Sequence, residues 1–343
     1  MARPQFTAGL AKLVRDWCAL DQITQLLRDA KGTRDEVRVS APNKEILVEK
    51  NLREAVESGA IPPDKIYSLV REAEENGNQH IFYYRRSTGG AQASIGDVGS
   101  RLWGAQWPEK IEFPKVDLVE NDFIFSDLHQ WNERLKPHDW VLKIYGHEFA
   151  DKPTNIVEEI GDNRFKREFF REERRIVVVV RWNNPGILEM RVPLTESKKR
   201  VKQWLEKAWL MIAPACRPTE YSKWNLQKAR RRMIDEQKQK QQVYRFSNTR
   251  LLDGDHNVAS FECHDPQRHL FASQGVADSV KALIGNGECT HLRVTWLQGK
   301  NPFPSRELNT VVGNNESNEI VIGGYCSSQD VDYVTDQLRH FSR

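Results

Sequence analysis

Basic side chains gather in one short stretch of the chain, residues 195–240. That stretch holds 13 Lys and Arg against 5 Asp and Glu, a net charge of +8, whereas the whole 343-residue chain carries +3. Cations on the solvent face of two neighbouring helices can neutralise phosphates and release counterions, which gives sequence-independent affinity for nucleic acids. We predict contacts by Lys198, Lys199, Arg200, Lys202, Lys223, Lys228, Arg230, Arg231 and Arg232. The alternative is a solvated helix face that is merely basic.

A second group of cations flanks a Gly-rich segment. Arg85 and Arg86 precede it and Arg101 ends it, and aromatic residues lie beside them on both sides. Arginines next to aromatic rings can contact phosphates while the rings stack on bases. We therefore add Arg85, Arg86 and Arg101 to the predicted nucleic-acid contacts. A packed aromatic strand with an exposed end explains the same pattern equally well.

Residues that could support catalysis are few. The sequence has no GxxxxGK[ST], GxGxxG, GxSxG or HExxH motif. Carboxylates and imidazoles that could bind a divalent metal occur between residues 253 and 269, namely Asp253, Asp255, His256, Glu262, His264, Asp265 and His269. Polar turns between strands are the favoured interpretation of that group.

A nuclease-like pattern also fits in part, with Asp162 upstream of Glu189 and Arg191. Its usual lysine is replaced by Arg191, and arginine stays protonated and is a poor base. We therefore predict no metal, no cofactor and no catalytic residue, and the protein is more readily explained as a non-enzyme.

The composition and the first residues of the sequence indicate where in the cell the protein is expected. No apolar run approaches the roughly 20 residues of a membrane-spanning helix, and the first 20 residues lack a secretory pattern. The five cysteines are widely spaced without a CxxC motif, which argues against a disulfide framework and a structural zinc module. The sequence predicts a soluble, intracellular protein of the cytoplasm, nucleoid or nucleus, with no membrane partner. Its oligomeric state is left open.

The elements that must position these side chains begin with a helical bundle over residues 1–86. Apolar residues recur there at spacings of three and four, Asn43 is placed to cap a helix, and Pro63 is placed to begin the next one. Residues 87–102 are small and Gly-rich, which predicts a hinge. The bundle is the first of the expected domains.

The pattern then changes to α+β over residues 103–240 and 241–343, with a mixed, mainly antiparallel sheet. Strands are predicted at residues 140–145, 155–160, 174–182 and 187–192, the last two as an antiparallel hairpin. Two basic helices follow, one capped by Thr195 and one over residues 223–240. Further strands at 243–252, 258–263, 292–297 and 319–323 alternate with helices at 274–284 and 329–341.

The order of parts resembles the centromere protein N family. The local similarity lies in NKEILVEKNLREAV followed by IPPDKIYSLVREAEENGNQHIFYY, over residues 40–84, and beyond them it is architectural. The resemblance implies a death-domain-like N-terminal bundle, DNA binding by a basic groove between two domains, and partner docking by the C-terminal part.

Three functions remain in order of preference. The first is a non-catalytic protein that binds nucleic acid, with duplex DNA preferred, within a larger assembly that includes protein partners. The second is a protein-interaction adaptor in a multi-subunit antiviral defence or chromosome-maintenance complex. The third is a metal-dependent hydrolase or nuclease.

Overall fold

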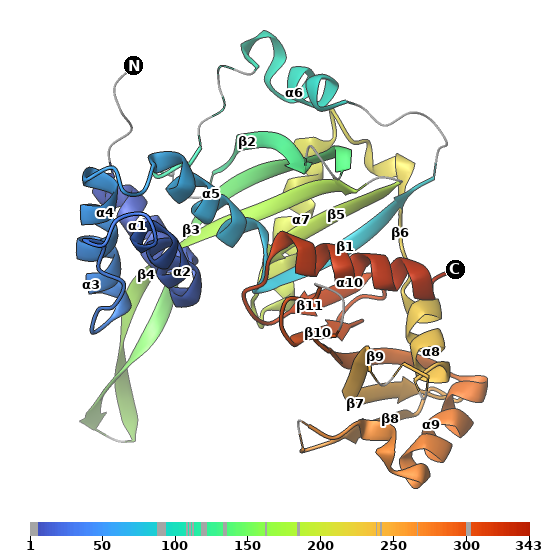
Figure 1. Cartoon of the computed structure of the whole chain (residues 1–343). Coiled ribbons are helices and arrows are strands. Elements are labelled where there is room, and N and C mark those ends of the chain that lie inside the picture. The colour runs from blue at the N-terminus through green and yellow to red at the C-terminus, as the bar shows by residue number, and fades with distance from the viewer. Residues whose placement is uncertain are drawn as a thin grey trace.

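The N-terminal helices pack around one apolar core (Figure 1). A computed structural model describes residues 6–343 except 88–93, 108, 110, 112, 118–121, 133–135, 162, 184–185, 238, 241, 266 and 300–302. The bundle consists of α1 (Ala8–Trp17), α2 (Leu20–Lys31), α3 (Lys44–Ile46), the π-helix η1 (Leu47–Leu52), α4 (Arg53–Glu57) and α5 (Pro63–Glu75). The two helix starts predicted in the bundle are confirmed: the Asn43 side chain accepts from the Ile46 amide, and Pro63 is the first residue of α5. The cap predicted at Thr195 is wrong, because the helix there begins at Lys198 and the Ser197 side chain accepts from the Arg200 amide.

The rest of the chain is built on one 11-stranded sheet. Its strands are β1 (Gln79–Arg86), β2 (Phe123–Asn132), β3 (Lys136–Gly161), β4 (Arg164–Asn183), β5 (Ile187–Pro193), β6 (Tyr221–Lys223), β7 (Tyr244–Leu252), β8 (Val258–Glu262), β9 (Glu288–Trp296), β10 (Leu308–Val312) and β11 (Glu319–Ile322). They lie in the order β2-β3-β4-β5-β1-β11-β10-β9-β7-β8, and β6 pairs with β1. The described pairs are antiparallel, so the predicted α+β class is confirmed, as is the β4–β5 hairpin.

The helices after the bundle are α6 (Ile95–Trp103), α7 (Lys198–Ile212), α8 (Gln227–Asp235), α9 (Gln274–Asn286) and α10 (Ser328–Phe341), with short 3-10 turns η2 (Gly104–Gln106), η3 (Pro218–Glu220) and η4 (Leu270–Ala272). Alternate residues of a strand point to opposite faces of its sheet. On β1, Ile81 and Tyr83 belong to the core that also contains residues of α8, α9 and α10, which defines the first face. Phe82 and Tyr84 belong to the core with residues of α6 and α7, which defines the second face. Figure 1 shows α10 in front of the sheet and α7 behind it.

Two predicted boundaries are corrected by this arrangement. The last residues of the expected 1–86 bundle form β1, which lies inside the sheet between β5 and β11. Residues 95–103 of the expected hinge form α6, because Ser94 accepts from the Asp97 amide and caps a helix there. The remaining hinge residues 88–93 lie outside the described residues. The sheet also continues across the expected boundary at residue 240.

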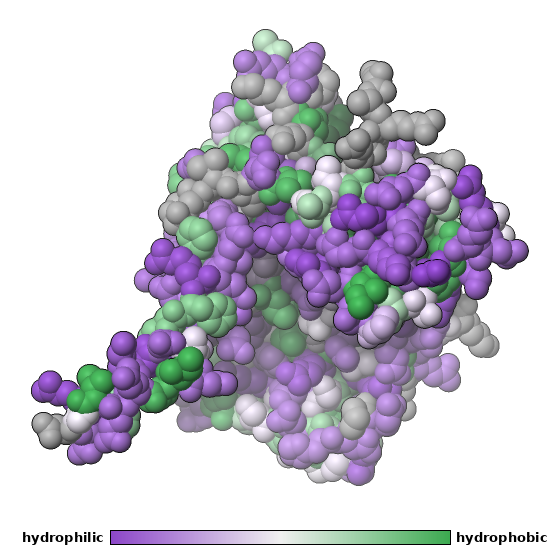
Figure 2. All heavy atoms as spheres, turned by 90° about the vertical axis from the view of Figure 1, so that its left-hand side faces the viewer, coloured by the Kyte–Doolittle hydropathy of each residue, from purple (hydrophilic) through white to green (hydrophobic). Residues whose placement is uncertain are grey.

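Strands β3 and β4 extend beyond their neighbours as a two-stranded hairpin. The last β2 pairing partner on β3 is Gly146, and the β5 partners on β4 lie within 179–183. We call residues 147–161 and 164–175 the arm. The arm was not predicted. Separate strands were expected at 140–145 and 155–160, whereas both stretches belong to the 26-residue strand β3. Figure 2 shows the arm projecting from the body of the protein.

Candidate functional site

Four of the predicted contact residues lie in the first turns of α7, on the second face of the sheet: Lys198, Lys199, Arg200 and Lys202. Carboxylates offset two of them. The Arg200 Nε lies 3.6 Å from Glu148 Oε1, and the Lys202 Nζ lies 3.8 Å from Glu206 Oε1. The first pair is half-buried and the second is exposed, and both reduce the positive potential of this helix.

The other basic helix, α8, lies on the first face, so the cations of α7 and α8 do not form one continuous surface. Arg230 is 2% exposed, and its guanidinium donates to the backbone carbonyls of Cys289 (2.6 Å) and Ser317 (3.4 Å). The prediction that Arg230 contacts nucleic acid is therefore corrected: this side chain holds α8 against the sheet. Lys228 and Arg231 are exposed, and Arg232 is half-buried.

Arg85 and Arg86 lie in an open pocket of ≈ 600 Å³ at the end of β1. Basic side chains from β1, from the last turn of α10 and from the residues after it line this pocket together, namely Arg85, Arg86, Arg339, His340 and Arg343. Asp336 is the one acidic residue among the described residues that line the pocket. A concave site with such an excess of arginine is suited to an anion, because guanidinium groups bind phosphate in a bidentate manner.

The pocket continues onto α8. The Lys228 Nζ donates to the backbone carbonyl of Arg343 (2.5 Å), and Arg232 donates to that of His340 (3.5 Å). We call the combined area the α8–α10 basic surface. It comprises Arg85, Arg86, Lys228, Arg231, Arg232, Arg339, His340 and Arg343.

Carboxylates reach only part of this surface. Arg86 pairs with Glu220 (3.0 Å), Arg232 with Glu236 (2.6 Å) and Arg339 with Asp336 (3.4 Å). Burial and the nearby charge of Arg339 lower the pKa of Arg85. A bound anion would relieve the repulsion between these two arginines, which favours phosphate binding at this point.

The remaining predicted residues lie on other parts of the surface. Lys223 of β6 pairs with Glu316 (2.8 Å) and, with Lys198 and Lys202, lines a groove of ≈ 450 Å³ between α7 and the sheet. Arg101 is exposed in the last turn of α6, also on the second face. The structure thus divides the predicted contacts between two faces.

Arg339, His340 and Arg343 were not predicted. Residues 241–343 carry more Asp and Glu than Lys and Arg, so a count over the whole block hides Arg339 and His340 in the last turn of α10 and Arg343 just after it. Helical spacing contains the missing signal, because residues three and four apart lie on the same helix face.

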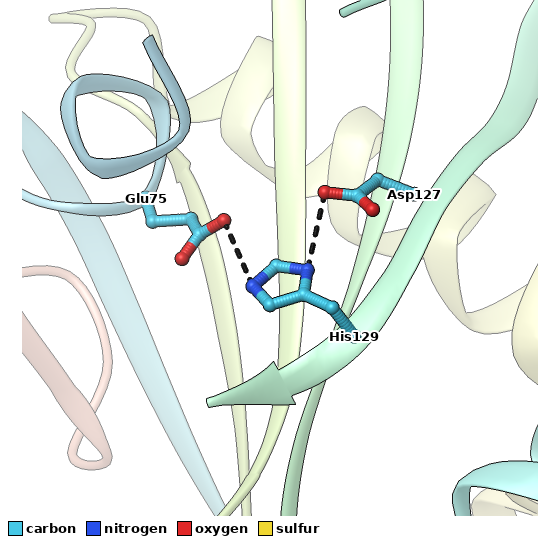
Figure 3. Close-up of side chains that lie close together, drawn as sticks. All are labelled: Glu75, Asp127 and His129. Carbon is cyan, nitrogen blue, oxygen red and sulfur yellow. Dashed lines mark ion pairs between the residues drawn. The ribbon is translucent and has the colours of Figure 1, made fainter. Parts of the chain in front are cut away.

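A separate cluster joins the bundle to the sheet. Glu75 of α5, with Asp127 and His129 of β2, brings two carboxylates and an imidazole together (Figure 3). Within the described part of the chain, this is the one group of three or more His, Cys, Asp or Glu side chains spaced closely enough to share a metal ion. This cluster was not predicted from the sequence, because Glu75 is about fifty residues from the other two.

Two residues of the predicted 253–269 group, Glu262 and His264, line an open pocket of ≈ 630 Å³, but among the described residues that group has no three ligand atoms close enough to share a metal ion. The Asp253 carboxylate accepts hydrogen bonds from the backbone amides of Asp255 (2.9 Å) and Asn257 (2.8 Å). These contacts within one turn agree with the polar-turn interpretation. Glu189 and Arg191 are fully buried and pair with each other at 2.5 Å, where no substrate can reach them. Asp162 lies outside the described residues.

Comparison with known proteins adds no further assignment. No protein-family model matches the sequence, and no curated protein matches it significantly. None of the described helices has both the length and the apolar character needed to cross a bilayer.

Proposed function

We propose that this protein is a non-catalytic nucleic-acid-binding subunit of a larger assembly, and that duplex DNA lies on the α8–α10 basic surface. One observation carries the proposal: arginines from β1 and α10 meet in one open pocket beside the exposed cations of α8. The pocket lies on the first face, so the proposed contacts exclude the predicted lysines of α7.

The proposed binding is electrostatic. Arginine and lysine side chains contact phosphates, fix the position of the duplex, and carry no base information themselves. Affinity then falls steeply with salt, since each phosphate contact releases condensed counterions. Any sequence preference comes from DNA shape or from partner proteins.

The order of parts supports the same proposal. A helical bundle precedes an α+β region, as in the centromere protein N family that residues 40–84 resemble. We extend the resemblance to a death-domain-like bundle and to a role on chromosomal DNA. The basic groove expected between two domains is less favourable here, because Lys12 and Lys152 in the hollow between α1 and the arm pair with Glu173 and Glu172.

A salt titration tests this function. A fluorescein-labelled duplex of about 20 base pairs should bind, and the logarithm of its association constant should fall by about 0.9 per phosphate contact for each tenfold rise in salt. Fluorescence anisotropy between about 50 and 200 mM salt measures both quantities. Absence of binding at the lowest salt concentration contradicts the proposal.

The arm favours a second function, that of a protein-interaction adaptor. Several of its large apolar side chains are exposed, namely Phe149, Ile156, Val157, Ile160, Phe165, Phe169 and Phe170. No strand within the described ranges pairs with the outer edge of β4 over residues 164–175. Exposed apolar groups beside an unpaired strand edge are typical of protein-docking sites.

Replacing Phe165, Phe169 and Phe170 with serine tests the adaptor function. These side chains are 62%, 61% and 50% exposed, so the free energy of unfolding should change by about 0.5 kcal/mol or less per site. Any stoichiometric partner that co-purifies from the native source, measured by quantitative mass spectrometry, should be lost. A control variant with serine at Lys166, Arg167 and Glu168 should keep the partner. Retention by the phenylalanine variant removes the arm as the docking site.

A further inference from the structure

Ion pairs from one helix hold the N-terminal bundle against the sheet. On α5, Glu74 Oε2 lies 3.1 Å from the Lys143 Nζ, and Glu75 Oε1 lies 2.9 Å from the same ammonium. Arg71 lies 3.2 Å from Asp127 of β2. The last two turns of α5 therefore form a charged contact with β2 and β3, and its stability depends on the protonation states of the groups within it.

His129 is at the centre of this contact. Its Nε2 lies 3.4 Å from Glu75 Oε1 and its Nδ1 lies 3.1 Å from Asp127 Oδ2 (Figure 3). The side chain of His129 is 19% exposed, and those of Glu75 and Asp127 are 5% and 2% exposed. A neutral imidazole donates from one nitrogen, whereas an imidazolium donates from both. Two carboxylates on opposite sides of one ring therefore fit the imidazolium form.

A metal centre fits the same three side chains poorly. One ion can bind one nitrogen of an imidazole, but the two nitrogens of His129 point to different carboxylates. The geometry corresponds to a proton-binding site.

We propose that His129 is a proton-dependent clamp: the imidazolium ties α5 of the bundle to β2 of the sheet, and loss of its proton loosens that attachment. The proposal is independent of nucleic-acid binding. Charged and titratable groups face the clamp from each neighbouring element: Arg71, Glu74 and Glu75 from α5, Asp127 from β2, Lys143 and Tyr145 from β3, and Arg175 from β4.

The balance of these groups favours a charged ring. The carboxylates of Glu74, Glu75 and Asp127 are almost fully buried, whereas Lys143 is the cation buried among them, and Arg71 and Arg175 approach from the edge with 35% and 10% exposure. Arg71 pairs with Asp127 and Arg175 pairs with Glu74, whereas Glu75 shares Lys143 with Glu74. A proton on the ring of His129 therefore gives Glu75 a second cation. With the proton removed, Glu75 loses its ion pair with the imidazolium in a site of low dielectric.

The pKa directions agree with this geometry. Burial opposes the charge on His129, but Glu75 and Asp127 outweigh burial and raise its pKa above the ordinary 6.5. Burial likewise opposes ionisation of Glu75, yet Lys143 and His129 lower its pKa to about 2. A raised histidine pKa stabilises the folded contact fully below the ordinary value, and this stabilisation is lost as pH rises through the raised value. The clamp therefore opens on the alkaline side.

Hydrogen exchange of the full-length protein tests the clamp. After correction for intrinsic rates, amide exchange in residues 63–75 should accelerate by about tenfold or more between about pH 6 and pH 9. His129→Gln should exchange rapidly at both pH values. His264→Gln, which replaces an exposed histidine in a turn, should behave like the wild type. Equal pH dependence of exchange in wild type and His129→Gln overturns the proposal.

A second measurement covers the case in which His129→Gln does not fold. In an NMR titration of the nine histidines, labelled at Cε1, one should titrate above 6.5 and shift to lower pH in Glu75→Gln. Adding Zn²⁺ should not change the wild-type titration. If no histidine responds to Glu75→Gln, or if Zn²⁺ suppresses titration of the one that does, the clamp is refuted.

Discussion

Replacing Arg191 with methionine should lower the free energy of unfolding by about 3–5 kcal/mol. Arg191 is fully buried on β5, and its guanidinium donates twice to Glu189 Oε2, at 3.1 Å through Nε and 2.5 Å through a terminal nitrogen. It also donates to the backbone carbonyl of Glu75 (2.7 Å), at the end of α5. Methionine therefore leaves a buried carboxylate poorly compensated and removes a link between bundle and sheet. Urea unfolding at about pH 7 measures the loss.

The pH dependence of this loss identifies its cause. Burial opposes ionisation of Glu189, but Arg191 and Arg181 lower its pKa to about 2. A lowered carboxyl pKa contributes stability above the ordinary value of 4.5, and this contribution is lost as pH falls through about 2. Without Arg191 the pKa of Glu189 rises, so the deficit should shrink between about pH 7 and pH 5.

The double variant Arg191→Met with Glu189→Gln is the control. It removes the charge as well as its partner, so it should recover a measurable part of the lost stability. A deficit below about 1 kcal/mol in the single variant, or a deficit that does not change with pH, contradicts the role given to this pair.

The second large effect is on DNA affinity. Replacing Arg85, Arg231 and Arg343 with glutamine should weaken duplex binding by about a hundredfold at about 100 mM salt and reduce the salt slope by about 2.7. The three side chains are exposed, so the fold should be retained. They come from β1, α8 and the C-terminal end of the described chain, so together they cover each part of the α8–α10 basic surface. Anisotropy titrations at several salt concentrations measure both changes.

A variant matched in charge separates local contacts from general electrostatics. Glutamine at Lys198, Lys199 and Lys202 on α7 removes the same three charges from exposed positions on the second face. This variant should lose less than tenfold in affinity. Equal losses mean that net charge alone drives binding, and a larger loss for the α7 variant places the DNA on the second face. Either result contradicts the proposed interface.

Local features of the fold could be predicted from the sequence. The cap at Asn43, the helix start at Pro63 and the β4–β5 hairpin follow from interactions between residues close in the chain. The place of β1 could not be predicted, because its partners in β5 and β11 lie more than 100 residues away. A hydrophobic run indicates that a strand is buried, but it does not specify the neighbours of that strand.

The dependence on contacts between distant residues also explains why the candidate site was predicted only in part. The sequence identified the cations of α7 and α8, but the chain passes from one face of the sheet to the other between these helices. For Arg230 a local signal existed: it lies four residues from both Leu226 and Ile234, on the buried stripe of α8. The pocket that joins Arg85 to Arg343 depends on long-range packing of α10 beside β1, which no local pattern encodes.

Site-specific photocrosslinking tests the location of the DNA most directly. p-Benzoylphenylalanine in place of His340, which is exposed at the basic pocket, should crosslink to a labelled duplex on irradiation. The same group in place of Lys199 on α7 should not. Crosslinks at position 199 with none at position 340 would contradict the account.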